Sequence, residues 1–328
     1  MTTESSQPND LTRPDPFGPT LPEVIYLPPV PPRQRFRHNY KIHILLFVIT
    51  FLTVTYNELL AVVWQGPLNP RVWRLFLNPQ VFLTGLSFSV PLLLILTAHE
   101  FGHYFYCRRY RVDASLPYYL PFPLPPTGTL GAVIRIREAF PSKRALFDIG
   151  VAGPIAGFVM LLPFLWYGIT QSRIGPIQTG ADVLYFGEPL LFKLLAWIHF
   201  GPIREGYEVY LSQVGFAGWW GMLVTALNLL PFGQLDGGHI AYSLLGRRAV
   251  NVSIATVFIA FVLTGISASW ISVTIMMLVM AFFLGLRHPR IVDEHVPLDP
   301  SRKIIAAIAV VIFILCFTPV PIQMLFGK

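Results

Sequence analysis

The sequence predicts an all-α polytopic membrane protein, and its composition and apolar stretches are the main reasons. Hydrophobic residues make up 54% of the 328 residues and charged residues only 12%, with a mean hydropathy of +0.57. Soluble domains carry about 25% charged residues, so this chain has roughly half the usual charge. Apolar stretches long enough to cross a bilayer recur along the chain. These observations favour membrane helices over one large soluble core.

Seven apolar stretches are candidate transmembrane helices, because a span needs about 20 mostly apolar residues. The fifth and sixth are separated only by Thr264–Ser269, so the expected number of spans is six or seven. We therefore assign residues 43–326 to a transmembrane domain. The stretches cover residues 43–64, 81–106, 145–169, 214–232, 250–267, 269–286 and 303–326.

Residues 1–42 are expected to form a disordered, proline-rich cytoplasmic tail. Prolines are concentrated between Pro14 and Pro32, which favours an extended chain. The segment has no apolar centre, unlike a signal peptide, and its four acidic residues argue against an acidic-poor transit peptide. Because no targeting segment is recognised, we expect the protein in a bacterial cytoplasmic membrane.

The net charge of +7 is better explained by membrane topology than by nucleic-acid binding. If the N-terminus is cytoplasmic, 18 of the 24 Lys and Arg residues lie on the cytoplasmic side, as the positive-inside rule expects. Seven of these lie in the 107–144 loop. Basic and aromatic residues are not interleaved as in single-strand binding proteins, so no nucleic-acid partner is expected.

A cluster of ionisable residues closes the second apolar stretch. Residues 81–98 carry no charge, and His99-Glu100-Phe101-Gly102-His103 follows directly. Ionisable groups at membrane depth are costly to bury and usually functional. Residues four apart lie on one face of a helix, so His99 and His103 can reach one metal ion. Glu100 beside them can act on water, which is the pattern of a zinc-protease helix.

The best candidate for a third ligand is Asp236, because catalytic zinc usually takes three protein ligands. It follows the fourth stretch in Asn228-Leu229-Leu230-Pro231-Phe232-Gly233-Gln234-Leu235-Asp236-Gly237-Gly238. In the predicted topology this segment lies at the same membrane depth as His99 and His103. Cys107 and His239 are rival ligands, and Asp236 alternatively belongs to an Asp-Gly-Gly turn.

The two motifs together resemble those of the site-2 protease family of intramembrane zinc metalloproteases. The resemblance covers roughly residues 81–239, and it implies a three-helix catalytic core there. It also implies one zinc ion per chain held by His99, His103 and Asp236, with Glu100 as the general base. Asn228 is implied to polarise the scissile carbonyl or to stabilise the oxyanion, although an interhelical hydrogen bond is the alternative for this side chain.

The uncharged loop from Ala114 to Ile134 is the candidate substrate site. Its prolines prevent a regular helix, and Thr129–Ile136 reads as a short strand. The loop resembles the membrane-dipping segment of the same family, which has an edge strand near the active site. An unwound substrate helix could add to that edge as another strand. An ordinary interfacial loop is the alternative.

The function predicted from the sequence is zinc-dependent endoproteolysis within the bilayer. The expected substrate is a transmembrane protein, cut in or near its membrane helix during regulated intramembrane proteolysis. The alternative is a polytopic transporter or metal-handling protein that binds zinc without protease activity. No oligomeric state is predicted.

Overall fold

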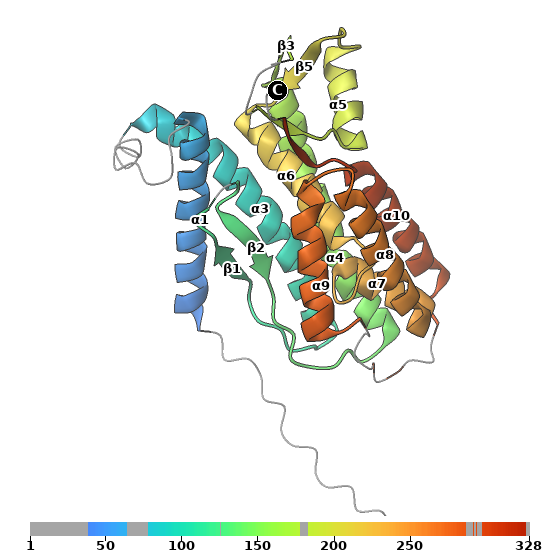
Figure 1. Cartoon of the computed structure of the whole chain (residues 1–328). Helices are drawn as coiled ribbons and strands as arrows, with labels where there is room; N and C mark the ends of the chain where they lie inside the picture. The colour runs from blue at the N-terminus through green and yellow to red at the C-terminus, as the bar shows by residue number, and fades with distance from the viewer. Residues whose placement is uncertain are drawn as a thin grey trace, which may run out of the picture. The chain divides into compact units, whose positions relative to one another are not determined.

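The computed structural model describes residues 39–63, 78–124, 126–177, 183–286, 291, 293 and 297–325. The expected tail lies outside the described residues, except for its last four positions. Figure 1 shows a mainly helical chain with a few short strands. The α-helices are α1 (Tyr40–Val63), α3 (Pro79–Arg109), α4 (Lys143–Thr170), α5 (Leu190–Phe200), α6 (Gln213–Asn228), α7 (Asp236–Leu245), α8 (Ala249–Thr264), α9 (Ser269–Leu284) and α10 (Pro300–Cys316).

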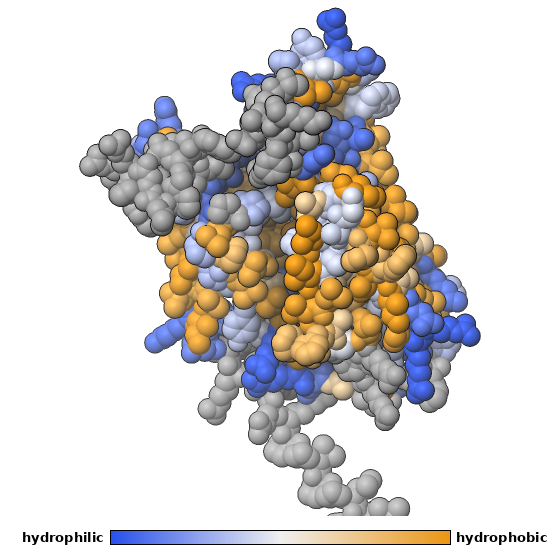
Figure 2. All heavy atoms as spheres, in the orientation of Figure 1, coloured by the Kyte–Doolittle hydropathy of each residue, from blue (hydrophilic) through white to orange (hydrophobic). Residues whose placement is uncertain are grey.

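Four helical segments among the described residues are long and apolar enough to cross a membrane: Tyr40–Leu59, Pro79–Arg109, Lys143–Thr170 and Asp236–Thr264. Helices α6, α9 and α10 have 16, 16 and 17 residues. On the face drawn in Figure 2, hydrophobic side chains cover the middle of the helices and hydrophilic ones gather toward the helix ends. The chain is thus a candidate multi-pass membrane protein, and six or seven spans stay a prediction.

Close helix packing joins α3, α4 and α6. A Cβ added at Gly168 of α4 would lie 2.1 Å from the Gly215 Cα of α6, and one at Gly221 would lie 3.1 Å from Ile95 on α3. Such small residues let helix backbones approach when lipid supplies no hydrophobic driving force between helices. Phe88, Leu161 and Met222 are among the fully buried side chains of this packing.

Helix ends follow the local sequence. The hydroxyls of Ser142 and Ser212 accept hydrogen bonds from Ala145 N and Gly215 N, which caps the starts of α4 and α6. Within the predicted span 214–232, helix α6 ends at Asn228, three residues before Pro231. A proline disfavours helical conformation in the residue before it and has no N–H to donate.

Three two-stranded antiparallel sheets correct the expectation of an all-α chain with one short hairpin loop. They pair β1 (Tyr118–Pro121) with β2 (Thr129–Val133), β3 (Arg173–Pro176) with β5 (Tyr207–Tyr210), and β4 (Val183–Phe186) with β6 (Ile322–Leu325). The last predicted span, 303–326, was too long: α10 ends at Cys316, and β6 follows Pro319 and Pro321. These prolines end the helix, so the apolar residues beyond them pair as a strand.

The β1–β2 hairpin lies between α1 and α3 (Figure 1). The His43 Nδ1 of α1 donates to the Pro117 carbonyl oxygen over 3.0 Å, and the Thr53 hydroxyl donates to the Gly128 carbonyl oxygen over 2.8 Å. Gly128 has φ +78°, and a Cβ there would lie 2.4 Å from Thr53 O, so only glycine fits. Helix α1 therefore holds the hairpin in place next to the histidines of α3.

Glu58, near the end of α1, is buried inside the protein. A carboxylate near the end of a span can extend to the membrane interface, but Glu58 is only 3% exposed. Nearby, the Thr55 hydroxyl donates to Ser89 of α3 over 2.8 Å, so this end of α1 presents polar groups to the protein interior.

Candidate metal centre and active site

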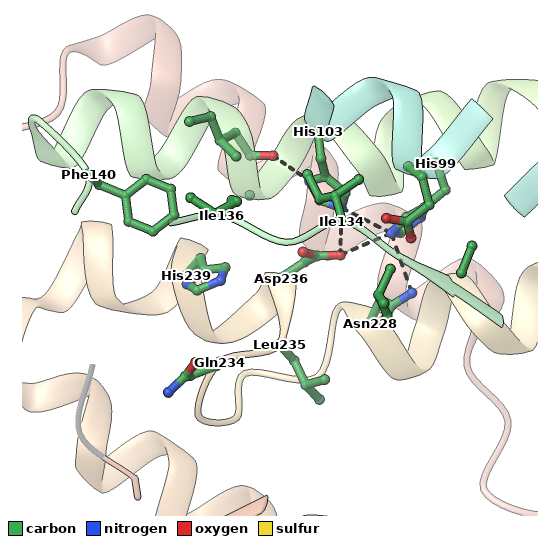
Figure 3. A pocket seen from close by; sticks show the side chains of 15 residues that line it. His99, His103, Ile134, Ile136, Phe140, Asn228, Gln234, Leu235, Asp236 and His239 are labelled. Atoms are coloured by element: carbon green, nitrogen blue, oxygen red, sulfur yellow. Dashed lines mark hydrogen bonds and ion pairs between the residues drawn. The ribbon is translucent and has the colours of Figure 1, made fainter. Parts of the chain in front are cut away.

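Three side chains from two helices converge on one point. His99 and His103 lie one turn apart on α3, and Asp236 is the first residue of α7. The two Nε2 atoms are 3.1 Å apart, and Asp236 Oδ2 lies 3.2 Å from His99 Nε2 and 3.3 Å from His103 Nε2 (Figure 3). The histidines are buried, with 4% and 7% exposure. The sequence-predicted ligands are therefore brought together by the fold.

The triangle of donor atoms has the dimensions of a metal site. Atoms that lie ~2.0–2.1 Å from a tetrahedral zinc ion are about 3.3–3.4 Å from one another. The three separations of 3.1–3.3 Å are close to this spacing. Two imidazoles and one carboxylate are also a donor set that zinc accepts. Among the described residues, these are the group whose His, Cys, Asp or Glu ligand atoms converge in this way.

The tautomer of His103 is determined by its outer hydrogen bond. His103 Nδ1 lies 2.7 Å from the Ile149 carbonyl oxygen of α4. A carbonyl oxygen only accepts, so Nδ1 carries the proton and donates. In the neutral ring, Nε2 then has a free lone pair directed toward Asp236 and His99. This is the arrangement in which a histidine binds a metal, with its other nitrogen bonded to a backbone oxygen.

Glycines of α4 make room for the two imidazoles. A Cβ at Gly153 would lie 2.0 Å from His103 Nε2, and one at Gly157 would lie 3.2 Å from the His99 Cβ. On α3 itself, a Cβ at Gly102 would lie 2.5 Å from the Ala152 carbonyl oxygen. The small residues thus let α4 pack directly against the histidine-bearing face of α3.

Glu100 lies in the cavity that contains the three candidate ligands. The cavity has a volume of about 250 Å³, and Glu100 is 7% exposed. Its carboxylate lies next to the backbone of Ile134, just beyond β2. Apolar side chains, including Val133 and Ile134, form much of the remaining wall. A carboxylate is therefore held beside the donor triangle and next to the expected substrate strand.

Asn228 reaches the same cavity from the end of α6. Its Nδ2 lies 3.5 Å from His99 Nε2, and the segment that follows carries Gln234 and Asp236 into the cavity (Figure 3). Asn228 is the last residue of α6, and its side chain points toward His99 (Figure 3). An amide here can donate a hydrogen bond to a group bound beside His99.

The rival ligands lie elsewhere or face differently. Cys107 is fully buried in an apolar cluster with Tyr104 and Ile149, and it is absent from the converging group. His239 lines the cavity, but its ring lies 5.8 Å from the Phe140 ring, and it too is absent from that group.

Sequence reasoning missed the groups that act through the backbone. Ile149 contributes its carbonyl oxygen to His103, and no side-chain pattern marks such a role. Phe140 and Gln234 also line the cavity, although they lie in irregular segments with no periodic signal. The Gly153-Pro154-Ile155-Ala156-Gly157 segment, with glycines four residues apart, is the sequence signal that could have pointed to close packing by α4.

The fold and the site define a helical protein with membrane-span candidates around a buried His-His-Asp centre. The family model for peptidase family M50 matches residues 87–268, which include both motifs. The chain belongs to this family, the site-2 proteases, and the resemblance of its motifs is confirmed.

Three curated plant proteins illustrate the similarity. "Probable zinc metalloprotease EGY2, chloroplastic" of Arabidopsis thaliana is 30% identical over 214 residues, covering 64% of this chain and 37% of that protein. "Probable zinc metallopeptidase EGY3, chloroplastic" of the same plant is 30% identical over 263 residues, covering 74% and 44%. "Probable zinc metalloprotease EGY1, chloroplastic" of Oryza sativa subsp. japonica is 29% identical over 233 residues, covering 65% and 39%. The matches thus span less than half of these relatives.

Proposed function

We propose that the protein is a zinc-dependent endopeptidase that hydrolyses peptide bonds of membrane proteins within the bilayer. The main support is the convergence of His99, His103 and Asp236 around one point, with Glu100 in the same cavity. The site is built on two segments that can cross a membrane, Pro79–Arg109 and Asp236–Thr264. Membership of peptidase family M50 supports the same activity.

In this proposal His99 Nε2, His103 Nε2 and an Asp236 carboxylate oxygen hold one zinc ion. A zinc ion here supplies Lewis-acid chemistry, polarising the scissile carbonyl and making water more acidic. The Glu100 carboxylate accepts a proton from the attacking water and then delivers it to the leaving amine nitrogen. The Asn228 Nδ2 donates a hydrogen bond to the oxygen of the scissile carbonyl, where negative charge develops.

The substrate is proposed to bind as a strand along the free edge of β2. Among the described residues, β2 pairs with β1 alone. Arg137 N donates to Asp113 O and Ser115 N donates to Arg135 O, so these residues just after β2 direct their backbone groups toward the segment before β1. Backbone groups alternate between the two edges of a strand, so we infer that Ala132, three residues before Arg135, presents its N–H and C=O to the outer edge. An unwound membrane helix can satisfy its own backbone groups there.

We also propose how the chain is divided into domains and oriented in the membrane. The transmembrane protease domain covers residues 43–326, with a catalytic core at about 81–239 and the cavity open toward the cytoplasm. The N-terminus is cytoplasmic, because the Lys and Arg residues gather on that side. A bacterial cytoplasmic membrane stays a prediction, since the relatives above carry chloroplastic names.

The decisive experiment compares wild type with Glu100→Gln, each co-expressed with a panel of single-span membrane proteins. Wild type should cleave at least one of them, and Glu100→Gln should bind zinc without cleaving any. Asp236→Asn removes a proposed zinc ligand instead of the proposed base, so this variant should lose zinc. Zinc binding without cleavage in wild type would instead favour a zinc-handling membrane protein, and full cleavage by Glu100→Gln would exclude Glu100 as the base.

A further inference from the structure

A second polar cluster joins α10 to the back of the metal site. Arg302, in the first turn of α10, forms a two-pronged ion pair with Asp148 of α4. Its Nε donates to Oδ1 over 2.8 Å and its Nη2 to Oδ2 over 2.5 Å. The Tyr110 hydroxyl, just past the end of α3, donates to the same Oδ2 and accepts from Arg302 Nη2 over 3.2 Å. Three helices therefore meet in one network.

The network is shielded enough to hold these helices together. The side chains of Asp148 and Arg302 are 12% and 21% exposed. A planar guanidinium that bonds both oxygens of a carboxylate restrains distance and also orientation, which a point charge does not. Asp299, the N-cap of α10, contacts Arg302 from the other side and fixes the start of that helix.

The network lies next to the group that orients a metal ligand. Asp148 directly precedes Ile149, whose carbonyl oxygen accepts from His103 Nδ1 over 2.7 Å. Both residues belong to the regular helix α4, so a rotation of the helix that moves Asp148 also moves the Ile149 carbonyl. Tyr110 follows α3, the helix that bears His99 and His103. The network thus holds together the two helices whose relative placement sets the His103 ring.

We propose that Arg302 is a positioning residue for the metal centre. Through Asp148 and Tyr110 it keeps α4 and α3 in the register at which the Ile149 carbonyl holds His103 Nε2 toward Asp236. Arg302 lies beyond residues 87–268, the part matched by the family model. This assigns a task to the last helix, which the motifs alone do not explain. The proposal rests on the proposed function only for the identity of the metal.

The test measures zinc affinity by competition with a chelator, using the purified full-length chain in detergent. Arg302→Gln should lower zinc affinity by about tenfold, at the low end of losses seen when an outer partner of a metal ligand is removed. The kcat should fall and KM should stay unchanged, because the substrate strand lies on another element. Arg302→Lys should recover part of the affinity, since it keeps the charge and loses the two-pronged geometry.

A double variant separates this mechanism from general destabilisation. If Arg302 acts through Asp148, Arg302→Gln combined with Asp148→Asn should lose little more zinc affinity than either single variant. The matched control is Lys193→Gln, which removes an exposed ion pair with Glu188 at 3.7 Å and should leave zinc affinity and kcat unchanged. Thermal unfolding midpoints show which variants fold.

Two outcomes would overturn the proposal. One is wild-type zinc affinity and kcat in a folded Arg302→Gln variant, or in Arg302→Lys if the glutamine variant does not fold. The other is independent, multiplying losses in the double variant. Zinc affinity is measured without a substrate, so this test does not depend on protease activity. A wild type that binds zinc but cuts nothing would contradict the proposed function, and the effect of Arg302 on zinc affinity could still be measured.

Discussion

His103 is the residue at which most of the site's constraints meet. Its ring is held by the Ile149 carbonyl at Nδ1, faces Asp236 and His99 at Nε2, and lies directly over Gly153. Each neighbour belongs to a different turn or helix, so the ring has little room to move. A metal ligand held this way is already oriented before the ion binds, which reduces the cost of ordering it.

Substitution of Gly153 by alanine tests this packing at the residue scale. The added Cβ would fall 2.0 Å from His103 Nε2, so either the ring or α4 must move. We expect Gly153→Ala to lower zinc affinity by about 10–100-fold, the range for disturbed ligand orientation. Chelator competition on the purified protein measures the change.

Substitutions at two other glycines give a weaker case and a control for the effect on zinc affinity. Gly157→Ala should act more weakly, because its Cβ would lie 3.2 Å from the His99 Cβ and small shifts can relieve the contact. Gly265→Ala, at the end of α8 with φ −71°, should leave zinc affinity unchanged. Equal affinities in all three variants would contradict the packing role of Gly153.

At the scale of elements, β2 is the proposed substrate-binding strand and lies beside Glu100. The burial of its side chains alternates from Ala132 at the end of β2 to Arg137 beyond it, and the Ile134 backbone lies next to Glu100. A substrate strand added at this edge would run past Glu100, the proposed general base. The hairpin is held by α1 and α3, through Thr53 and Thr97, so its position depends on two spans.

A proline at Ala132 tests the free edge of β2. Ala132→Pro removes the outward N–H and should reduce cleavage at least tenfold, while zinc affinity stays at the wild-type value because no ligand is touched. Ala132→Gly keeps the N–H and should retain cleavage. Proteolysis of a substrate identified in the panel, with zinc measured in parallel, gives the result. Unchanged cleavage by the proline variant would argue that the edge does not bind substrate.

The start of α10 gives a pH-dependent prediction. The pKa of Asp299 lies below its ordinary value, mainly because the Arg302 backbone N–H donates to the carboxylate. A lowered pKa in the folded state means stability that is present above the unfolded pKa of about 3.9 and lost as pH falls through the folded pKa. Wild type should therefore exceed Asp299→Asn in unfolding midpoint near pH 7. The difference should disappear in strong acid, and a difference independent of pH would rule out this carboxylate as the cause.

At the scale of the whole molecule, the two motifs come from segments 133 to 137 residues apart in sequence, yet they meet at one point. His99 lies ten residues before the end of α3, and Asp236 starts the segment Asp236–Thr264 that can cross a membrane. For both to lie at one depth, the intervening helices must return the chain to the same side. The charge bias predicts that this side is cytoplasmic.

Topology mapping tests that prediction. Reporter fusions placed in the 107–144 loop should be active only when the reporter functions in the cytoplasm, because seven basic residues there oppose translocation. Fusions within residues 170–213 should give the opposite pattern. A cytoplasmic signal from 170–213 would reverse the orientation and place the site at the other face of the membrane.

Much of the site could be predicted because its chemistry is local. His99 and His103 share a helix face at a spacing that needs no tertiary information, and Asp236 lies in a second recognisable motif. Ile149 and Arg302 could not be assigned this way, since their roles come from contacts between helices. The two additional sheets were missed because four-residue strands carry too little periodicity, and β6 pairs with a strand far earlier in the chain.

The sequence by itself determined the class of the protein, its apolar segments and the residues able to carry hydrolytic chemistry. Those features depend on composition, on hydropathy and on the 3.6-residue period of a helix, all of which are local. Only the tertiary structure decided that the donor atoms lie 3.1–3.3 Å apart, that His103 donates to Ile149, and that Arg302 reaches Asp148. These depend on how closely α3, α4 and α10 pack, and close packing is a property of helix pairs rather than of any one segment.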